Sequence, residues 1–522
     1  MVDTVSQPQT NSISSPLAQD EIMTAAKGSG ITFVGTLLEY GGRFVLGIIL
    51  ARFMGAEQYG LYSLADSAMF MVIGMALMGM DTALMHFIPI FSRRREATSL
   101  QATLRVGLGI PLVLGLLGGI GLFVFARSIS QSVFHEPRLA ILLRIVAFAA
   151  PFGVLSSAAV GATRGFKQMQ YKVIAQDIVL TLIKLVLTVL LAITGLTAMK
   201  AMTAYSVAVV ASCILLIYLL NKIAPLNRST GPWRQHLKQM FGFSLPVYVS
   251  RLLAMFGPNF RTVLLGMLST VFSVGVFTAA TRIRMVSMAF QNAMVVMASP
   301  IVSELYDHRE REKLGRFYQT VTKWTLTFNL PLFLIIVCFP QFLLSIFGQD
   351  FTAGAVALVI LACGDLVNAA TGICGVMVTM TGNPWLNTVN SILSLTVTLL
   401  FSLWLIPTMG IVGAGIAAMV SITFSNLFQL IAVFVLFRLL PYDRSFVKPV
   451  LAGAAAAAVT WAATRWFLTG SDWVSVIVNM GILLSVYAAM IFGLGLSEED
   501  QFVLRHFYSR LSRVTRSGRG AP

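Results

Sequence analysis

Residues 37–70 read LLEYGGRFVLGIILARFMGAEQYGLYSLADSAMF, and this stretch predicts how the rest of the chain is built. It contains an apolar segment long enough to cross a bilayer, a short break at residues 54–57, and the beginning of a second apolar segment. The pattern returns 215 residues later, where Gly275-Val276-Phe277 takes the place of Gly60-Leu61-Tyr62. A repeat of this length is unlike the short period of a soluble repeat protein and is typical of two membrane-embedded halves.

Further matches between the two halves follow in the same order along the chain. They pair Pro89-Ile90-Phe91-Ser92 with Pro300-Ile301-Val302-Ser303, Pro111 with Pro331, Thr163-Arg164-Gly165 with Met380-Thr381-Gly382, and Gly195-Leu196 with Gly410-Ile411. The offset varies between 211 and 220, mainly because the loops at 92–99 and 303–315 differ. We therefore predict that one membrane unit has been duplicated.

Composition places the chain among polytopic membrane proteins, since 57% of its 522 residues are hydrophobic and only 11% are charged. Soluble domains carry about a quarter charged residues. The net charge of +16 would suggest a nucleic-acid partner for a soluble protein, but in a membrane protein basic residues fix the topology, so we expect no nucleic acid. The four cysteines lie in apolar runs without metal-ligand spacing, which predicts buried thiols and no metal.

A window of about 20 residues predicts an all-α polytopic membrane protein with about 14 transmembrane helices. The predicted spans are 29–52, 61–90, 100–126, 140–163, 172–195, 199–220, 241–268, 272–300, 321–346, 354–381, 386–408, 410–437, 446–468 and 474–496. If the N-terminus is placed inside, 25 Lys and Arg residues fall in inner segments and 5 in outer segments. This imbalance predicts that both termini are cytoplasmic.

Each repeat then contains six spans and starts from the cytoplasm, so the fold should consist of two parallel six-helix repeats plus two extra C-terminal helices. The loop 303–320 and the tail after Ser497 are expected to form amphipathic interfacial helices. The predicted domains are a cytoplasmic tail 1–28, an N-terminal bundle 29–222, a cytoplasmic linker 223–240, a C-terminal bundle 241–438, two additional helices 446–496, and a basic cytoplasmic tail 497–522.

Ionisable residues inside the spans are the candidate site, because charges in lipid are costly and usually face a protein interior or a water-filled cavity. We expect the substrate cavity to be lined by Glu39, Arg43, Asp81, Lys184, Arg251, Arg261, Arg282 and Arg284. These residues either form a cationic cavity for an anionic ligand or pair with one another to hold helices together. Both interpretations remain open from the sequence.

Two local patterns sharpen this prediction. Glu39 and Arg43 are four residues apart and can pair on one helical face, and removing Arg43 is then expected to leave Glu39 unpaired. Gly257-Pro258 predicts a hinge in the seventh span, because proline removes one backbone hydrogen bond. Broken helices at a repeat interface are where transporters bind substrates. No phosphate-binding Gly-rich motif and no catalytic motif occurs, so we expect a transporter and no enzyme, without a cofactor.

Four stretches resemble the multidrug/oligosaccharidyl-lipid/polysaccharide (MOP) exporter superfamily, and more narrowly the Wzx-type polysaccharide flippases. They are 51–60 (ARFMGAEQYG), 79–84 (GMDTAL), Arg164-Gly165 and 303–306 (SELY), and the resemblance extends over about 29–496. It implies two bundles with twelve core helices plus two, alternating access, and transport of an undecaprenyl-pyrophosphate-linked glycan. It assigns no individual site residue.

Two functions remain open at this point. The first is a lipid-linked oligosaccharide flippase in the cytoplasmic (inner) membrane, where arginine side chains would suit a pyrophosphate. The second is a cation-coupled exporter of drugs or metabolites, which would favour exposed carboxylates. The expected partners are a lipid-linked glycan, membrane lipids, and a polysaccharide polymerase or another assembly protein. A coupling ion, H⁺ or Na⁺, is compatible with both functions.

Overall fold

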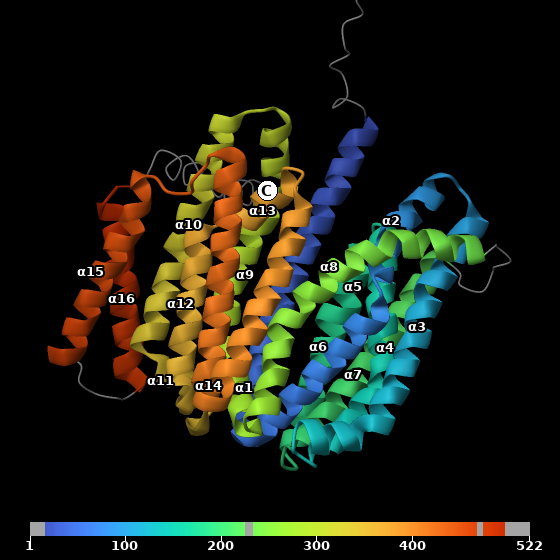
Figure 1. The fold of residues 1–522 in the computed structure, drawn as a ribbon, viewed down its shortest axis with the longest axis horizontal. Helices are drawn as coiled ribbons and strands as arrows, with labels where there is room; N and C mark the ends of the chain where they lie inside the picture. Colours follow the sequence, from blue (N-terminus) through green and yellow to red (C-terminus); the bar gives the residue numbers. More distant parts are fainter. Residues whose placement is uncertain (1–15, 225–232, 467–472, 496–522) are drawn as a thin grey trace, which may run out of the picture. The chain divides into compact units, whose positions relative to one another are not determined.

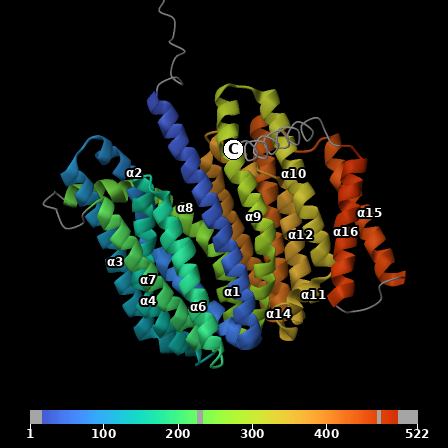
Figure 2. The same cartoon turned by 180° about the vertical axis from the view of Figure 1, so that it is seen from behind.

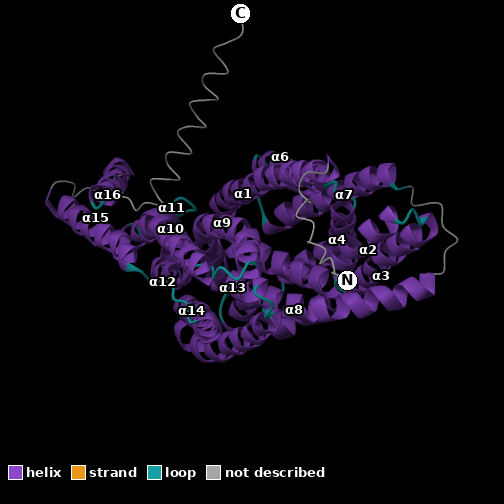
Figure 3. Cartoon of the chain, turned by 90° about the horizontal axis from the view of Figure 1, so that it is seen from above, coloured by secondary structure: helices purple, strands orange, loops and turns teal. Residues whose placement is uncertain are grey.

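Helices account for all the regular secondary structure in the described part of the chain (Figures 1 and 3). The computed structural model describes residues 16–224, 233–466 and 473–495. The elements in chain order are α1 (Pro16–Leu77), α2 (Met80–Arg93), α3 (Ala97–Ser128), η1 (Ile129–Val133), α4 (Leu139–Gly165), α5 (Met169–Lys172), η2 (Val173–Val179), α6 (Leu180–Ala192), α7 (Ala198–Ile223), α8 (Trp233–Leu268), α9 (Val271–Asp307), α10 (Arg311–Cys338), α11 (Pro340–Ser345), η3 (Gln349–Gly354), α12 (Ala355–Thr371), α13 (Cys374–Met380), α14 (Pro384–Phe437), η4 (Arg444–Phe446), α15 (Val447–Trp466) and α16 (Trp473–Gly493).

Eleven helices in the described ranges are long and apolar enough to cross a membrane, which confirms the polytopic all-α fold. The predicted number of 14 spans stays a prediction. Two of the eleven, α1 and α14, each contain one glycine with a non-helical backbone, Gly55 (φ 74°, ψ 172°) and Gly410 (φ 54°, ψ −121°). Both conformations are accessible to glycine alone, so each glycine divides its long helix into two arms.

Backbone conformation supports the proposed duplication. Gly195 and Gly410, matched 215 residues apart, both have positive φ, at 80° and 54°. The matched prolines also lie inside corresponding helices, Pro111 in α3 and Pro331 in α10. Corresponding positions of the two repeats therefore have corresponding structural roles.

Two predicted spans are interrupted at a glycine with positive φ. The span 61–90 breaks at Met78 and Gly79, whose φ values are 44° and 71°, so that α1 ends and α2 begins there. The span 354–381 breaks at Gly372 (φ 68°), between α12 and α13. Both segments remain apolar across the break. A hydrophobicity window depends on composition alone, so it does not detect the change in backbone direction.

The prediction of an interfacial helix at 303–320 was wrong. α9 continues to Asp307 and α10 begins at Arg311, so the two helices form a hairpin whose turn contains Arg309 with φ 57°. The 37 residues of α9 span about 55 Å, well beyond a hydrocarbon core of about 30 Å. Alternating charges in this stretch thus mark the ends of two long helices. The predicted tail helix after Ser497 lies outside the described residues.

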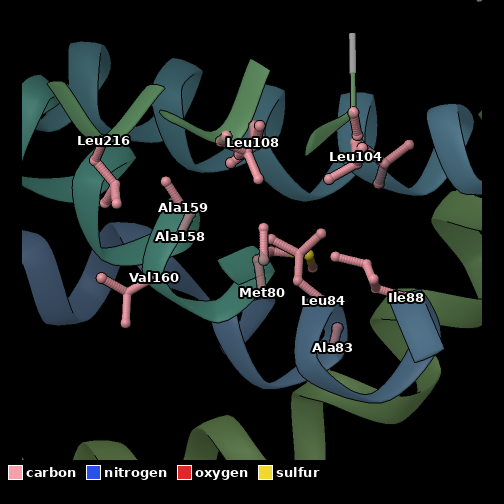
Figure 4. Packing of buried hydrophobic residues seen from close by; sticks show 14 of the residues in the cluster. Met80, Ala83, Leu84, Ile88, Leu104, Leu108, Ala158, Ala159, Val160 and Leu216 are labelled. Atoms are coloured by element: carbon pink, nitrogen blue, oxygen red, sulfur yellow. The ribbon is translucent and has the colours of Figure 1, made fainter. Parts of the chain in front are cut away.

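Contacts divide the chain into two compact units. The N-terminal unit contains the residues up to Met54 and Leu64–Met255, and the C-terminal unit contains Gly55–Ser63 and the residues from Phe256 onward. In the N-terminal unit, buried residues of α2, α3, α4 and α7 form one apolar core (Figure 4). In the C-terminal unit, one core joins α9, α10, α13 and α14, and a second joins α10 to α15 and α16.

Polar pairs join the two arms of α14 inside the C-terminal unit. Asn390 Nδ2 donates to Ser425 Oγ at 2.8 Å, and the Ser394 and Ser421 hydroxyls lie 2.9 Å apart. Lipid provides no hydrophobic force between helices, so such hydrogen bonds and close packing hold the hairpin together.

Candidate functional site

Four charged side chains form a chain of ion pairs in the N-terminal unit. On α1, Arg43 Nη2 lies 2.9 Å from Glu39 Oε1, which confirms the predicted pair. Glu39 Oε2 lies 3.5 Å from Lys172 Nζ, and Lys172 Nζ lies 2.6 Å from Asp177 Oδ1. The group holds two positive and two negative charges. Arg43 is its most accessible member, with 55% of its side chain exposed.

Lys172 and Asp177 meet because of an unusual helix. They are five residues apart, a spacing that an α-helix places on different faces. Residues Val173–Val179 form the π-helix η2, in which hydrogen bonds span five residues. The wider turn of the π-helix brings the Asp177 carboxylate close to the Lys172 ammonium group.

Side chains from two neighbouring helices hold this π-helix. Gln176 Nε2 donates to Ser156 Oγ on α4 at 3.0 Å. Ser212 Oγ on α7 donates to the carbonyl of Ala175 at 2.7 Å. π-helical turns recur at functional sites, and this one is fixed on two sides.

Asp177 is almost completely buried, and its second oxygen, Oδ2, has no hydrogen-bond partner among the described residues. The backbone of Gly35 on α1 lies against this oxygen, since a Cβ there would be 2.6 Å from Oδ2. Glu39 also contacts Lys172, so the expectation that losing Arg43 leaves Glu39 unpaired was wrong. Lys172 would remain as its partner.

The C-terminal unit contains a second charged group. Arg284 on α9 donates to Asp365 on α12 through two nitrogens, with Nε 2.6 Å from Oδ2, and both residues are buried. Gln291 Nε2 donates to the Asp365 carbonyl at 3.4 Å, and Asn368 Nδ2 donates to Gln291 Oε1 at 2.5 Å. These bonds fix the orientation of the Arg284 guanidinium.

Arg261 gives this second group an excess of positive charge. It lies half-buried on α8, within electrostatic range of both Arg284 and Asp365, and it has no ion-pair partner among the described residues. Two guanidinium groups therefore lie within electrostatic range of one carboxylate. The sequence shows the same excess, since Asp365 is the only acidic residue in the predicted spans from 241 to 437. The same spans contain five basic residues, Arg251, Arg261, Arg282, Arg284 and Lys323.

Two other predicted cavity residues make contacts outside these two groups. Lys184 Nζ lies 4.0 Å from the ring centroid of Tyr205, between α6 and α7. Arg282 Nη1 donates to Met285 Sδ at 3.6 Å, and Asp81 lies in the first turn of α2.

Three predicted positions lie outside the described side chains, namely Arg251, Gly257 and Pro258. The backbone of α8 is helical through these positions, and the proposed hinge stays a prediction. The boundary between the two units falls between Met255 and Phe256, next to it.

The predicted site omitted three members of these groups, Lys172, Asp177 and Asp365. For Asp177, the available signal was its spacing of five residues from Lys172, which suits a π-helix. For Asp365, the available signal was the scarcity of acidic residues in the predicted spans of the second repeat. Lys172 was assigned to a cytoplasmic segment because it begins a predicted span.

Two family models match the chain. The family model described as polysaccharide biosynthesis protein matches residues 25–306, more than half of the chain. A second family model, MatE, matches residues 246–412. The two matches overlap across α8 and the beginning of the second repeat.

Among curated proteins, the chain is similar to the probable low-salt glycan biosynthesis flippase Agl15 of Haloferax volcanii, with 24% identity over 209 residues. This match covers 40% of the chain and 44% of the relative, so the chain spans less than half of that protein's length.

Solved structures share the fold. The lipid II flippase MurJ in an inward closed conformation matches with a TM-score of 0.71 at 13% identity, over 88% of this chain and 98% of MurJ. An inward-facing MATE-family multidrug resistance transporter of the MOP superfamily matches with a TM-score of 0.62 at 18% identity, over 76% and 93% of the two chains. The family match over more than half of the chain shows that this chain belongs to the polysaccharide biosynthesis protein family, and the solved structures share its fold.

Proposed function

We propose that this protein moves an undecaprenyl-pyrophosphate-linked oligosaccharide, the repeat unit of a surface polysaccharide or O-antigen, across the cytoplasmic membrane by alternating access. It acts as a transporter, and the glycan passes through chemically unchanged. Both termini lie in the cytoplasm, in agreement with the excess of basic residues in the predicted inner segments. The family match and the similarity to a glycan flippase support this proposal.

The observation that carries the proposal is the group formed by Arg261, Arg284 and Asp365. Asp365 neutralises and orients Arg284, and the charge of Arg261 is left over. A pyrophosphate is a multivalent anion, and planar guanidinium groups bind its oxygens through paired hydrogen bonds. An excess cation in a membrane interior is costly without a ligand, so an anionic substrate would stabilise this arrangement.

Substitutions of Arg261 test this assignment. Arg261→Ala should reduce translocation of a fluorescent undecaprenyl-pyrophosphate oligosaccharide in proteoliposomes, and Arg261→Lys should restore part of it, because lysine keeps the charge and loses the planar fork. Arg144→Ala is the matched control, since Arg144 is exposed and lies over the Phe123 ring on α3. Wild-type translocation by Arg261→Ala at normal protein abundance would contradict the anion site.

The alternative function, a cation-coupled exporter of drugs or metabolites, is favoured by a different observation. Asp177 offers a buried carboxylate oxygen that has no hydrogen-bond partner in the described part of the chain, and a proton or Na⁺ could use it. The MatE match and the MATE structure are compatible with this reading. If it holds, Asp177→Asn should abolish ion-dependent export of a soluble cation, and the same variant should leave glycan-lipid translocation without a gradient intact.

The proposed substrate also implies partners. The glycan-lipid delivered to the outer face must be consumed there, so a polysaccharide polymerase or another assembly protein is the expected neighbour. Affinity purification after chemical cross-linking in the native membrane would identify it.

A further inference from the structure

Exposed basic side chains gather at the end of the N-terminal unit where α2, α4 and α7 finish. Six of them lie in the helix ends and turns there, namely Arg93, Arg94, Arg95, Lys167, Lys222 and Lys238. We refer to these six residues as the basic surface. The stretches that carry them, 93–97, 164–168, 221–224 and 233–241, contain one acidic residue, Glu96. This end of the unit therefore has an excess of positive charge, which neither candidate function uses.

Contacts inside the N-terminal unit bring these stretches together. The end of α4 reaches α2, because a Cβ on Gly165 would lie 3.0 Å from the Ile88 Cβ. The Phe91 ring near the end of α2 packs edge-on against His236 near the start of α8, with centroids 5.3 Å apart. Leu220, near the end of α7, is buried in the same core as Ile88. Figures 1 and 2 show the α2–α3 turn and the start of α8 side by side at this end.

Two turns of the basic surface place a cation in a backbone conformation that usually takes glycine. After α2, the Arg95 N–H donates to the Ser92 carbonyl at 3.2 Å, and the Glu96 N–H donates to the Phe91 carbonyl at 3.1 Å. This pair of bonds closes a helix through one left-handed residue, here Arg95 with φ 56°. Lys167 closes α4 in the same way, with φ 60°. A side chain at such a position costs folding free energy relative to glycine.

The second repeat contains the same two turns with a different charge. Arg309 (φ 57°) closes α9 as Arg95 closes α2, through the same two backbone bonds. Gly382 (φ 86°) closes α13 as Lys167 closes α4. The residues around Arg309, 304–316, include four acidic and four basic residues and are therefore balanced. The turn geometry alone thus does not require an excess of cations, and the basic surface is a property of the first repeat.

Neighbouring side chains place the basic surface at the level of lipid headgroups. Ile214, Tyr218 and Lys222 are spaced four apart and share one face of α7. Ile214 and Tyr218 are 62% and 56% exposed, and Lys222 Nζ lies 5.0 Å from the centroid of the Tyr218 ring. An apolar residue, a tyrosine and a cation in this order are typical of a helix that leaves the hydrocarbon core. On α8, Lys238 is exposed while Met240 packs into the core of the unit.

We propose that the basic surface binds the anionic headgroups of phosphatidylglycerol and thereby anchors the N-terminal unit at the membrane surface. A lipid headgroup is the anion that meets this border between exposed apolar and basic side chains. Guanidinium groups bind phosphate oxygens through paired hydrogen bonds, and basic residues beside an anionic leaflet are stabilised by its surface potential. This attraction offsets the cost of the left-handed backbone at Arg95 and Lys167. The proposal is independent of the transported substrate.

Glycine substitutions test the proposal, because Arg95→Gly and Lys167→Gly keep the turn and remove the charge. The purified protein in a neutral maltoside detergent is titrated with short-chain phosphatidylglycerol, and the thermal unfolding midpoint is followed. Without lipid, each variant should unfold at a higher temperature than the wild type, because glycine adopts this backbone without strain. With lipid, the apparent Kd of each variant should be about fivefold higher than that of the wild type. A role in folding alone would not change this Kd.

Arg309→Gly is the matched control, since it changes the same kind of turn in a charge-balanced setting. It should also unfold at a higher temperature, with the wild-type Kd for phosphatidylglycerol. Short-chain phosphatidylcholine should stabilise all four proteins equally. The proposal would be overturned by a wild-type protein that phosphatidylglycerol stabilises no more than phosphatidylcholine, or by an equal change of Kd in Arg309→Gly. A wild-type Kd in both Arg95→Gly and Lys167→Gly would also overturn it, and an acidic protein would then be the better partner for this surface.

Discussion

Three of the four ion pairs in the two charged groups join residues that are distant or irregularly spaced in the sequence. The pair of Glu39 and Arg43 follows from α-helical spacing and was predicted. Lys172 and Asp177 can pair because the chain forms a π-helix between them. A search for α-helical periodicity does not detect a π-helix. Arg284 and Asp365 come from different helices and meet only in the folded chain. Local spacing thus predicts local pairs, and tertiary structure decides the others.

The buried pair of Arg284 and Asp365 should contribute to stability through the cost of leaving one charge alone. Asp365→Ala is expected to destabilise the protein by about 3–5 kcal/mol, and the double variant Arg284→Met with Asp365→Ala should be markedly milder. Thermal unfolding of the purified protein in detergent measures both.

The exposed pair of Arg316 and Glu312 provides the control for this prediction. Its atoms are 2.7 Å apart, but the side chains are 73% and 81% exposed. Glu312→Ala should therefore cost no more than about 1 kcal/mol. If Asp365→Ala and Glu312→Ala lowered the free energy of unfolding equally, burial would not govern how much each ion pair contributes to stability.

At the scale of the helices, the sequence predicts positions and apolar character well and backbone breaks poorly. The matched glycines Gly195 and Gly410 were identified as repeat anchors, and both have positive φ in the structure. The breaks at Gly79 and Gly372 were not predicted, because each lies within a stretch predicted as one continuous span. Glycine is common in membrane helices, so its presence alone does not distinguish a helical position from a break.

Gly410→Ala should destabilise the hairpin formed by α14. The backbone there has φ 54° and ψ −121°, which a residue with a Cβ adopts only with strain. We expect the free energy of unfolding to fall by about 1–3 kcal/mol, which would be measured as a lower thermal unfolding midpoint.

Gly481→Ala in α16 is the comparison for this variant, because it has an ordinary helical setting with open space around the missing Cβ. It should be neutral or slightly stabilising. A stable Gly410→Ala variant would mean that the two arms of α14 can be joined by another backbone conformation.

At the scale of the whole molecule, composition and repetition predict the all-helical polytopic architecture, and the family matches agree with it. The charged groups distribute unequally between the repeats: the N-terminal group is balanced, and the C-terminal group carries an excess cation. Duplication alone would predict equal groups. The difference arises because acidic residues are nearly absent from the spans of the second repeat, which a count over the entire chain conceals.

The orientation of the molecule is testable by labelling single cysteines in a cysteine-free background. The excess of basic residues in the predicted inner segments places Ser99 in the cytoplasm and Thr197 outside. A membrane-impermeant maleimide added to intact cells should label Thr197→Cys, and should label Ser99→Cys only after permeabilisation. Labelling of Ser99→Cys in intact cells would reverse the topology and with it the parallel arrangement of the repeats.

Translocation of a glycan-lipid by the purified protein tests the flippase assignment most directly. Proteoliposomes containing a fluorescent undecaprenyl-pyrophosphate oligosaccharide are treated with a membrane-impermeant quencher, with and without an imposed H⁺ or Na⁺ gradient. The flippase account predicts that substrate from the inner leaflet becomes accessible faster with the wild-type protein than in protein-free liposomes, and that Arg261→Ala slows this exchange. Wild-type exchange no faster than in protein-free liposomes under every gradient, together with ion-driven export of a soluble cation, would contradict it.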